Sequence, residues 1–328
     1  MIRILQRQPL VSATFTKALH PVLQQILLSR GVGEDAQLSL TLGDLLPPDA
    51  MLHIHKAAGL LVESLHQGEH VLIVGDFDAD GATSSALAVS GLQAMGFARV
   101  SFLVPNRFEF GYGLTPEIVD VAAQQAPDLI ITVDNGISSH AGIDRAHALG
   151  IKVLVTDHHL PGASLPDADC ILNPNQPGCP FPSKALAGVG VVFYLLIALR
   201  GLLREQGWFT ARALPEPNLA GMLDLVALGT VADVVPLDNN NRRLVNYGLQ
   251  LIRNGKARPG IVALLEAGNR NPARVIASDL GFAAGPRLNA AGRLDDMSLG
   301  IACLLAQDSF TARRLALELD SLNQDRKS

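Results

Sequence analysis

Residues 70–81, HVLIVGDFDADG, contain an apolar run that ends in three alternating aspartates. The run is apolar at every position, which favours a strand buried on both faces within a parallel sheet. Three similar runs follow, at residues 100–104, 129–133 and 151–155. Residues 170–172 form a shorter fifth candidate. The pattern therefore predicts a sheet of about five strands.

Helical patterns separate these runs. They cover residues 82–95, closed by Gly96, then 116–125 behind the N-cap candidate Thr115, then 139–149, closed by Gly150. Strands that alternate with helices of this length indicate an α/β fold, a parallel sheet with helices on both faces. From residue 184 onward the sequence predicts a mainly helical region.

Composition and charge set further bounds. The chain has 328 residues, of which 48% are hydrophobic and 17% charged, which excludes a mainly disordered protein. The net charge of −5 argues against a nucleic-acid partner, but its distribution is uneven. Residues 1–235 carry 13 basic and 22 acidic side chains, whereas residues 236–328 carry 13 and 9. Residues 242–293 hold nine basic side chains against two acidic ones, which would attract a phosphate backbone or form an ordinary solvated face.

The three cysteines, Cys170, Cys179 and Cys303, form no CxxC pair, which favours a reducing compartment. The amino terminus has no apolar core of signal-peptide length. The apolar, uncharged stretch at residues 185–199 is shorter than the roughly 20 residues that cross a bilayer. We therefore expect a cytoplasmic protein without a membrane partner.

Acidic and imidazole side chains follow three of the predicted strands, and one more aspartate follows a helical pattern. They are Asp76, Asp78, Asp80, Asp134, Asp157, His158, His159 and Asp233. The carboxyl ends of parallel strands meet at one edge of the sheet, where ligands bind. Carboxylates gathered there repel one another unless a cation lies among them, and mixed Asp and His ligands suit Mn²⁺, Mg²⁺ or Zn²⁺.

Two simpler interpretations compete with a metal site. DxDxDG matches the first half of an EF-hand loop, but its twelfth position is Leu87 rather than Glu, and the motif follows a strand. A single aspartate at a strand end is more often a helix cap than a ligand. Four such sites in one fold, three of them at strand ends, favour a metal site over four separate helix caps.

These motifs carry a family resemblance. GDFDADG, VDNG, TDHH and GTVADVVPL, in this order, resemble the four motifs of the DHH phosphoesterase superfamily. GPRLNAAGRL at residues 285–294 resembles the RecJ branch of single-strand-specific 5′→3′ exonucleases. The resemblance implies metal-dependent hydrolysis of single-stranded DNA to mononucleotides, in DNA repair and recombination, with two divalent ions, Mn²⁺ preferred or Mg²⁺. It also implies single-stranded DNA as partner, together with a single-strand-binding protein and a helicase.

The resemblance covers about residues 45–328 and implies a domain plan. Residues 1–44 would be an N-terminal extension and 45–308 the DHH catalytic domain, with an α/β part at about 70–172 and a helical part at about 184–308. Residues 309–328 would begin a connecting helix to a DHHA1 domain. We expect the chain to be truncated before that domain.

Individual roles follow from the same resemblance. The implied metal ligands are Asp78, Asp80, Asp134, His158 and Asp233, with Asp134 bridging two ions. His159 would contact the scissile phosphate, and Asp76 and Asp157 would be outer ligands or acceptors that orient the imidazoles.

Substrate contacts are expected in two segments. The loop at residues 106–113 contains Arg107, Phe108, Phe110 and Tyr112, a set that suits phosphate pairing and base stacking, although these rings could instead pack into the core. In residues 285–294 the expected phosphate contacts are Arg287, Asn289 and Arg293. By resemblance, Arg107 and one of these arginines would hold the 5′-terminal phosphate. The helix start at residues 81–84 offers a phosphate cradle or is capped by its own Thr or Ser.

Two other functions compete. One is a DHH phosphoesterase for short oligonucleotides or cyclic dinucleotides, against which the RecJ-like motif speaks. The other is a non-catalytic replication scaffold of the degenerate DHH type, which typically has lost metal ligands that this sequence retains.

Overall fold

The computed structural model describes residues 14–16, 18–104, 111–294 and 297–325. The chain divides into two compact units, residues 1–45 and 46–328. The described part of the first unit has one α-helix, α1 (Pro21–Leu28), and two 3₁₀ turns, η1 (Asp35–Leu38) and η2 (Leu42–Asp44). The second unit contains the sheet.

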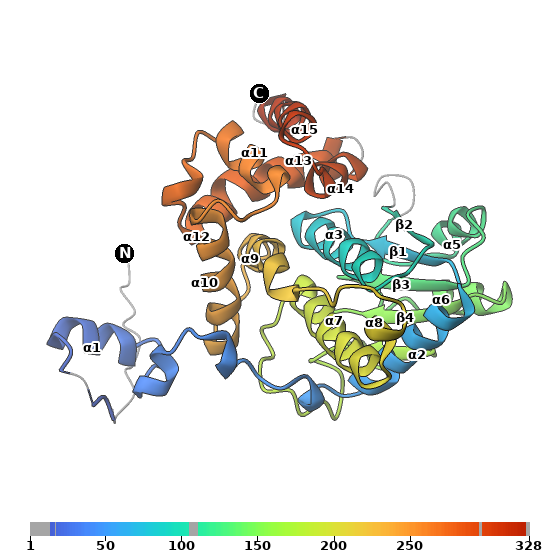
Figure 1. Cartoon of the computed structure of the whole chain (residues 1–328), viewed down its shortest axis with the longest axis horizontal. Helices are drawn as coiled ribbons and strands as arrows, with labels where there is room; N and C mark the ends of the chain where they lie inside the picture. Colours follow the sequence, from blue (N-terminus) through green and yellow to red (C-terminus); the bar gives the residue numbers. More distant parts are fainter. Residues whose placement is uncertain (1–13, 17, 105–110, 295–296, 326–328) are drawn as a thin grey trace, which may run out of the picture. The chain divides into compact units, whose positions relative to one another are not determined.

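The second unit is built on a five-stranded parallel sheet (Figure 1). Its strands are β1 (Val71–Gly75), β2 (Val100–Leu103), β3 (Leu129–Val133), β4 (Lys152–Thr156) and β5 (Cys170–Leu172). Their order across the sheet is β2-β1-β3-β4-β5. The predicted α/β class and the five predicted strands are confirmed, because each observed strand begins and ends within one residue of its predicted bounds.

The register of the sheet brings the motif residues together. Gly75 pairs with Val133, and Val133 pairs with Thr156. The next residue along each strand is an aspartate: Asp76, Asp134 or Asp157. Three carboxylates therefore leave three neighbouring strands at the same edge.

Helices cover both faces of the sheet, as predicted. One face packs against α5 (Pro116–Ala123) and α6 (His140–Ala148), in a core that includes Leu72, Ile118, Ile130, Ile143 and Val153. The other face packs against α2 (Ile54–Gln67), α3 (Ala79–Ala94) and α7 (Gly188–Glu205). The predicted N-cap is present, since the Thr115 side chain accepts a hydrogen bond from the Ile118 N–H at the start of α5.

The rest of the second unit is helical. It comprises α8 (Trp208–Ala211), α9 (Leu223–Ala232), α10 (Asn239–Arg253), α11 (Pro259–Ala267), α12 (Ala277–Asp279), the π-helical η6 (Leu280–Ala284), α13 (Gly285–Leu294), α14 (Ser298–Leu305) and α15 (Ser309–Asp325). Short 3₁₀ turns lie at η3 (Pro48–Ala50), η4 (Leu219–Met222) and η5 (Pro272–Arg274). α9 packs against α3 and α7, and this contact brings Asp233, at the end of α9, toward the sheet. Within the described residues, no helix is both long and apolar enough to span a membrane.

Candidate metal centre

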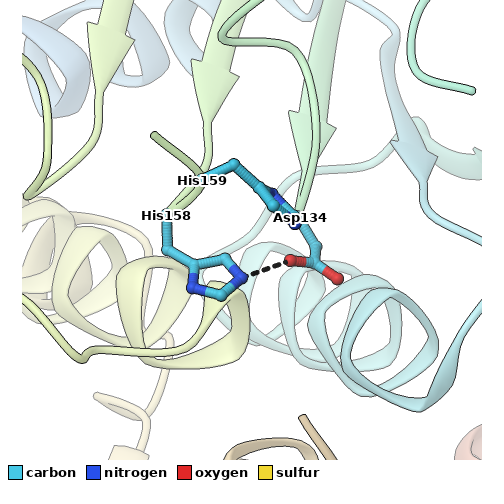
Figure 2. A group of neighbouring side chains, drawn as sticks. All are labelled: Asp134, His158 and His159. Carbon is cyan, nitrogen blue, oxygen red and sulfur yellow. Dashed lines mark ion pairs between the residues drawn. The ribbon is translucent and has the colours of Figure 1, made fainter. Parts of the chain in front are cut away.

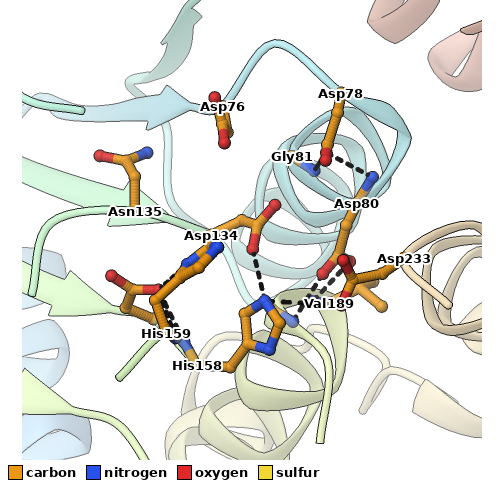
Figure 3. Close-up of polar contacts among 12 residues, drawn as sticks. Asp76, Asp78, Asp80, Gly81, Asp134, Asn135, His158, His159, Val189 and Asp233 are labelled. Carbon is orange, nitrogen blue, oxygen red and sulfur yellow. Dashed lines mark hydrogen bonds and ion pairs between the residues drawn. The ribbon is translucent and has the colours of Figure 1, made fainter. Parts of the chain in front are cut away.

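The predicted cluster converges at the carboxyl edge of the sheet (Figure 3). Three loops after β1, β3 and β4 and the end of α9 supply it. Ligand-type atoms of its side chains fall into three groups, within each of which all atoms lie within 4.8 Å of one another. The groups are Asp76–Asp78–Asp134, Asp80–His158–Asp233 and Asp134–His158–His159.

Asp78 is the N-cap of α3. Its Oδ1 accepts hydrogen bonds from the backbone N–H groups of Asp80 and Gly81, both at 2.9 Å. The capping carboxylate explains why α3 begins at Ala79 rather than at residue 82, where the apolar pattern placed it. The other carboxylate oxygen of Asp78 is not used in the cap.

The expected phosphate cradle at the start of α3 is wrong. Besides the two N–H groups that Asp78 binds, the Ala82 N–H donates to the Asp78 carbonyl at 2.9 Å and the Ala79 N–H donates to Asn289 Oδ1 at 2.7 Å. All four N–H groups of the first turn thus have partners inside the chain. The alternative, a cap by the helix's own Thr or Ser, is also wrong, because the capping side chains are Asp78 and Asn289.

Asp80 lies in the first turn of α3 and is fully buried. Its two oxygens accept hydrogen bonds from the N–H groups of Gly188, at 2.7 Å, and Val189, at 3.0 Å. Both donors are in the first turn of α7, whose positive helix terminus favours a carboxylate. α3 and α7 are therefore joined at the cluster itself.

Asp134 and His158 face each other across the sheet edge (Figure 2). Asp134 has a backbone φ of 63°, in the left-handed region, and its side chain is 2% exposed. His158 Nε2 lies 3.1 Å from Asp134 Oδ1 and 3.5 Å from Asp233 Oδ2. One imidazole nitrogen thus points between two carboxylates from different elements.

The facing side-chain atoms of Asp134, His158 and Asp233 are suited to bind a divalent cation. Asp134 Oδ1, His158 Nε2 and Asp233 Oδ2 are all buried, and within the described residues none has a hydrogen-bond partner of acceptable geometry. Buried polar atoms normally have a hydrogen-bond partner. Three neighbouring buried atoms without one therefore indicate a binding partner such as a cation. Carboxylate oxygens and an imidazole nitrogen are ligands of Mn²⁺, Mg²⁺ and Zn²⁺.

The pKa values agree with such a site. Burial and the neighbouring carboxylates raise the pKa of Asp80 and of Asp134 well above the ordinary value. Burial, followed by the charge of Asp78, raises the pKa of Asp76 to about 7. Burial lowers the pKa of His158 despite the nearby Asp233, which favours the neutral ring that binds metals. Without a cation, burial and mutual repulsion therefore disfavour the ionised forms of Asp76, Asp80 and Asp134.

Asp157 holds His159. Its Oδ1 lies 2.7 Å from His159 Nδ1 and also accepts the N–H groups of His158, at 2.7 Å, and His159, at 3.0 Å. Although burial alone would raise the pKa of Asp157, the hydrogen bond and charge of the His159 ring, together with the N–H groups of His159 and Ile137, lower it below its usual value. The same contact raises the pKa of His159 to about 9, so this imidazole carries a positive charge at neutral pH.

Of the predicted substrate residues, Tyr112 lies beside this imidazole. Its hydroxyl is 3.5 Å from each His159 ring nitrogen, its ring meets the Phe77 ring edge-on, and the residue is 54% exposed. Partial burial and the charge of Asp76 raise the pKa of Tyr112 above its usual value, so the phenol keeps its proton. The alternative, that the loop rings pack into the core, does not hold for this exposed tyrosine.

The other predicted substrate residues are less informative. Arg107, Phe108 and Phe110, and the side chain of Arg293, lie outside the described residues. The guanidinium of Arg287 binds within the chain, to Asp320 at 2.5 Å and to the carbonyls of Ala283 and Ala267. Asn289 Oδ1 accepts a hydrogen bond from the Ala79 N–H at the start of α3. The structure gives these two residues contacts that the sequence did not indicate.

Sequence reasoning also missed two glycines that line the centre. A Cβ on Gly188 would lie 2.7 Å from Asp134 Oδ1, and one on Gly229 would lie 2.2 Å from Thr83 Oγ1 and 2.8 Å from Asp80 Oδ1. Gly188 opens α7, and Gly229 is the first residue of the GTVAD motif. The motif indicated Asp233 as a ligand, and the glycine that begins it was the available signal for a close approach.

Residues 70–230 match the family model described as "DHH family, N-terminal domain". This is the class of protein that the fold and the cluster define. "Single-stranded-DNA-specific exonuclease RecJ" of Salmonella typhimurium is 59% identical over 309 residues, 94% of this chain and 54% of the relative. The protein of that name from Escherichia coli is 56% identical over 326 residues, 99% of this chain and 56% of the relative. The structure titled "Crystal structure of exonuclease RecJ bound to manganese" superposes with a TM-score of 0.73 at 38% identity, covering 86% of this chain and 67% of that one.

The chain therefore belongs to the DHH family, in its RecJ branch. It spans about half the length of the curated relatives it matches.

Proposed function

We propose that the chain is a metal-dependent exonuclease that hydrolyses single-stranded DNA in the 5′→3′ direction and releases mononucleotides. The observation that carries the proposal is the trio of orphaned, buried donor atoms on Asp134, His158 and Asp233. It lies in a chain of the RecJ branch, whose curated relatives are named for single-stranded-DNA-specific exonuclease activity.

The proposed cofactor is a pair of divalent ions, Mn²⁺ preferred or Mg²⁺. The residues that would hold the ions are Asp78, Asp80, Asp134, His158 and Asp233. Asp134 and His158 each belong to two of the three ligand groups and so link them. One related structure is titled as bound to manganese, and another, from Thermus thermophilus, as a complex with Mg²⁺. Two such ions supply an activated water and stabilise the attacking and leaving oxygens of a phosphodiester.

His159 is proposed to contact the scissile phosphate. Its imidazolium, with a pKa of about 9, is held on Asp157 through Nδ1, and the side chain remains 45% exposed. A fixed cation beside the cluster is suited to a phosphodiester oxygen. Asp76, with its pKa near 7, is proposed as an outer acceptor of the centre.

Single-stranded DNA is the proposed substrate. Tyr112 offers an exposed ring next to His159 for an unpaired base. Arg107, Phe108, Phe110, Arg287, Asn289 and Arg293 remain predicted contacts. A single-strand-binding protein and a helicase are proposed as partners in DNA repair and recombination. A cytoplasmic location is proposed because the three cysteines are free and buried.

The test is a digestion time course on single and double strands labelled at either the 5′ or the 3′ end, with Mn²⁺ or with EDTA. We expect labelled mononucleotides to appear at once from 5′-labelled single strands, and no release in EDTA. His158→Ala should abolish release while circular dichroism shows an intact fold. His55→Ala, whose imidazole is 75% exposed, is the matched control and should digest normally.

Other outcomes would support the competing functions. Faster cleavage of dinucleotides or cyclic dinucleotides than of long strands would indicate the short-oligonucleotide phosphoesterase. Single-strand binding without cleavage in Mn²⁺ would indicate the scaffold. Retained activity in His158→Ala would contradict the ligand assignment.

A further inference from the structure

α13, the helix formed by the GPRLNAAGRL motif, packs against the start of α3 and so reaches the metal-centre loop. The metal-centre loop is the segment Asp76–Asp80, which includes the first two residues of α3. It contributes three carboxylates to the centre (Figure 3). Asp80 is held by the N–H groups at the start of α7. Asp78 caps α3 through one oxygen, but that bond fixes its side chain relative to its own helix and not relative to Asp134.

The first contact of α13 with the loop is a hydrogen bond. The Ala79 N–H, on a residue that is 1% exposed, donates to Asn289 Oδ1 at 2.7 Å. Asp78 already accepts the next two N–H groups of the turn, so Asn289 completes the cap of α3. Without this acceptor, a buried donor would be left unpaired at the residue that follows Asp78.

The second contact is a backbone approach. A Cβ built on Gly292 would lie 1.8 Å from the Phe77 carbonyl oxygen, a distance no side chain tolerates. Gly292 follows Asn289 by three residues, so both lie on the same face of α13. Only a residue without a side chain lets α13 approach the loop this closely.

The two contacts flank Asp78 on both sides, at the Phe77 carbonyl and at the Ala79 N–H. We propose that Asn289 and Gly292 are positioning residues that set the Asp78 carboxylate, and thereby the divalent-metal affinity of the centre. This role differs from the phosphate contact that the motif suggested for Asn289, and it rests on the metal centre of the proposed function. Groups that orient metal ligands typically alter metal affinity by about 10- to 100-fold when removed.

The direct test is Mn²⁺ binding by the purified chain, measured by electron paramagnetic resonance of free Mn²⁺, without DNA or turnover. Asn289→Leu removes the acceptor at similar volume and should weaken Mn²⁺ binding about 10- to 100-fold. Asn289→Asp keeps an acceptor and should bind no more weakly than the wild type. If Asn289 only filled space, the two variants would have the same Mn²⁺ affinity.

Gly292→Ala should weaken Mn²⁺ binding at least as much as Asn289→Leu. Its matched control is Gly260→Ala, whose Cβ would lie 2.0 Å from the Cys303 carbonyl oxygen, where α11 meets α14. This variant meets a similar clash with a backbone carbonyl away from the centre, and it should lower the melting temperature while keeping wild-type Mn²⁺ affinity.

The results separate the two proposals. If the wild type binds no Mn²⁺, the metal centre of the proposed function fails. If the wild type binds Mn²⁺ and Asn289→Leu binds it equally well, the positioning role is overturned. Equal weakening by Gly260→Ala and Gly292→Ala would also overturn it, because general destabilisation would then explain the loss. Should Gly292→Ala not fold, the comparison of Asn289→Leu with Asn289→Asp decides alone.

Discussion

Replacing Asp76 with asparagine should stabilise the metal-free protein. Asp76 is 6% exposed, and burial together with the charge of Asp78 raises its pKa to about 7. Its one hydrogen bond within the described residues is from the Phe77 N–H to Oδ1, at 2.7 Å, which an asparagine oxygen can accept equally well. The substitution therefore removes a charge whose burial and repulsion from Asp78 outweigh its attraction to His159, and it keeps the hydrogen bond.

The size of the effect follows from the pKa. The ordinary value is 3.8, so between pH 3.8 and about 7 the folded protein retains a proton that the unfolded chain has released. Its free energy of unfolding falls with rising pH across this range and then levels off. At 1.36 kcal/mol per pKa unit, the accumulated cost is about 4 kcal/mol at pH 7.5 and close to zero below pH 3.8.

Urea unfolding in EDTA at a series of pH values measures this cost directly. We expect Asp76→Asn to exceed the wild type by about 4 kcal/mol at pH 7.5 and by progressively less toward pH 4.5. Asp224→Asn is the contrasting control. Asp224 is also buried but lies 3.2 Å from Arg258, so its neutralisation leaves an unpaired cation and should destabilise by about 3 kcal/mol. A gain for Asp76→Asn that is independent of pH, or a loss at pH 7.5, would refute the reasoning.

Three further outcomes follow from the same site. Gly229→Ala should weaken Mn²⁺ binding at least tenfold, because its Cβ would lie 2.8 Å from Asp80 Oδ1. Gly201→Ala, with nothing within 4 Å of its Cβ, should leave it unchanged, and similar behaviour of both variants in a Mn²⁺ titration would contradict this steric argument. Asp157→Asn should lower the pKa of His159 from about 9 toward its ordinary 6.5, as followed by NMR; an unmoved pKa would exclude the carboxylate as its cause. Mn²⁺ at 100 times its dissociation constant should stabilise the wild type against urea by about 2.7 kcal/mol and His158→Ala by much less, whereas equal gains would remove His158 from the ligand set.

Local pattern was enough to predict the sheet and the convergence of the cluster. Each strand is a short apolar run bounded by turn residues, and a parallel sheet necessarily gathers the ends of its strands at one edge. Asp76, Asp134 and Asp157 could therefore be placed together before any coordinate was known. The expectation needed only the order of the runs and the residue after each.

The contacts that hold the cluster could not be predicted in this way. The Ala79 N–H is bound by Asn289, 210 residues further along the chain, and the Asp80 carboxylate by α7, more than 100 residues away. Such pairings depend on how helices dock, and no periodicity in either segment encodes them. Gly188 was missed for the same reason, because it is recognisable as a close approach only once Asp134 lies beside it.

Asp78 shows why capping and metal binding need not be alternative interpretations of one aspartate. A helix cap engages one carboxylate oxygen, and in Asp78 both N–H donors fall on Oδ1. The same side chain lies in a ligand group with Asp76 and Asp134. Capping removes the rotational freedom of the carboxylate before any ion arrives, which lowers the entropic cost of binding. Asp78 thus serves the helix as its N-cap and the proposed metal centre as a member of a ligand group.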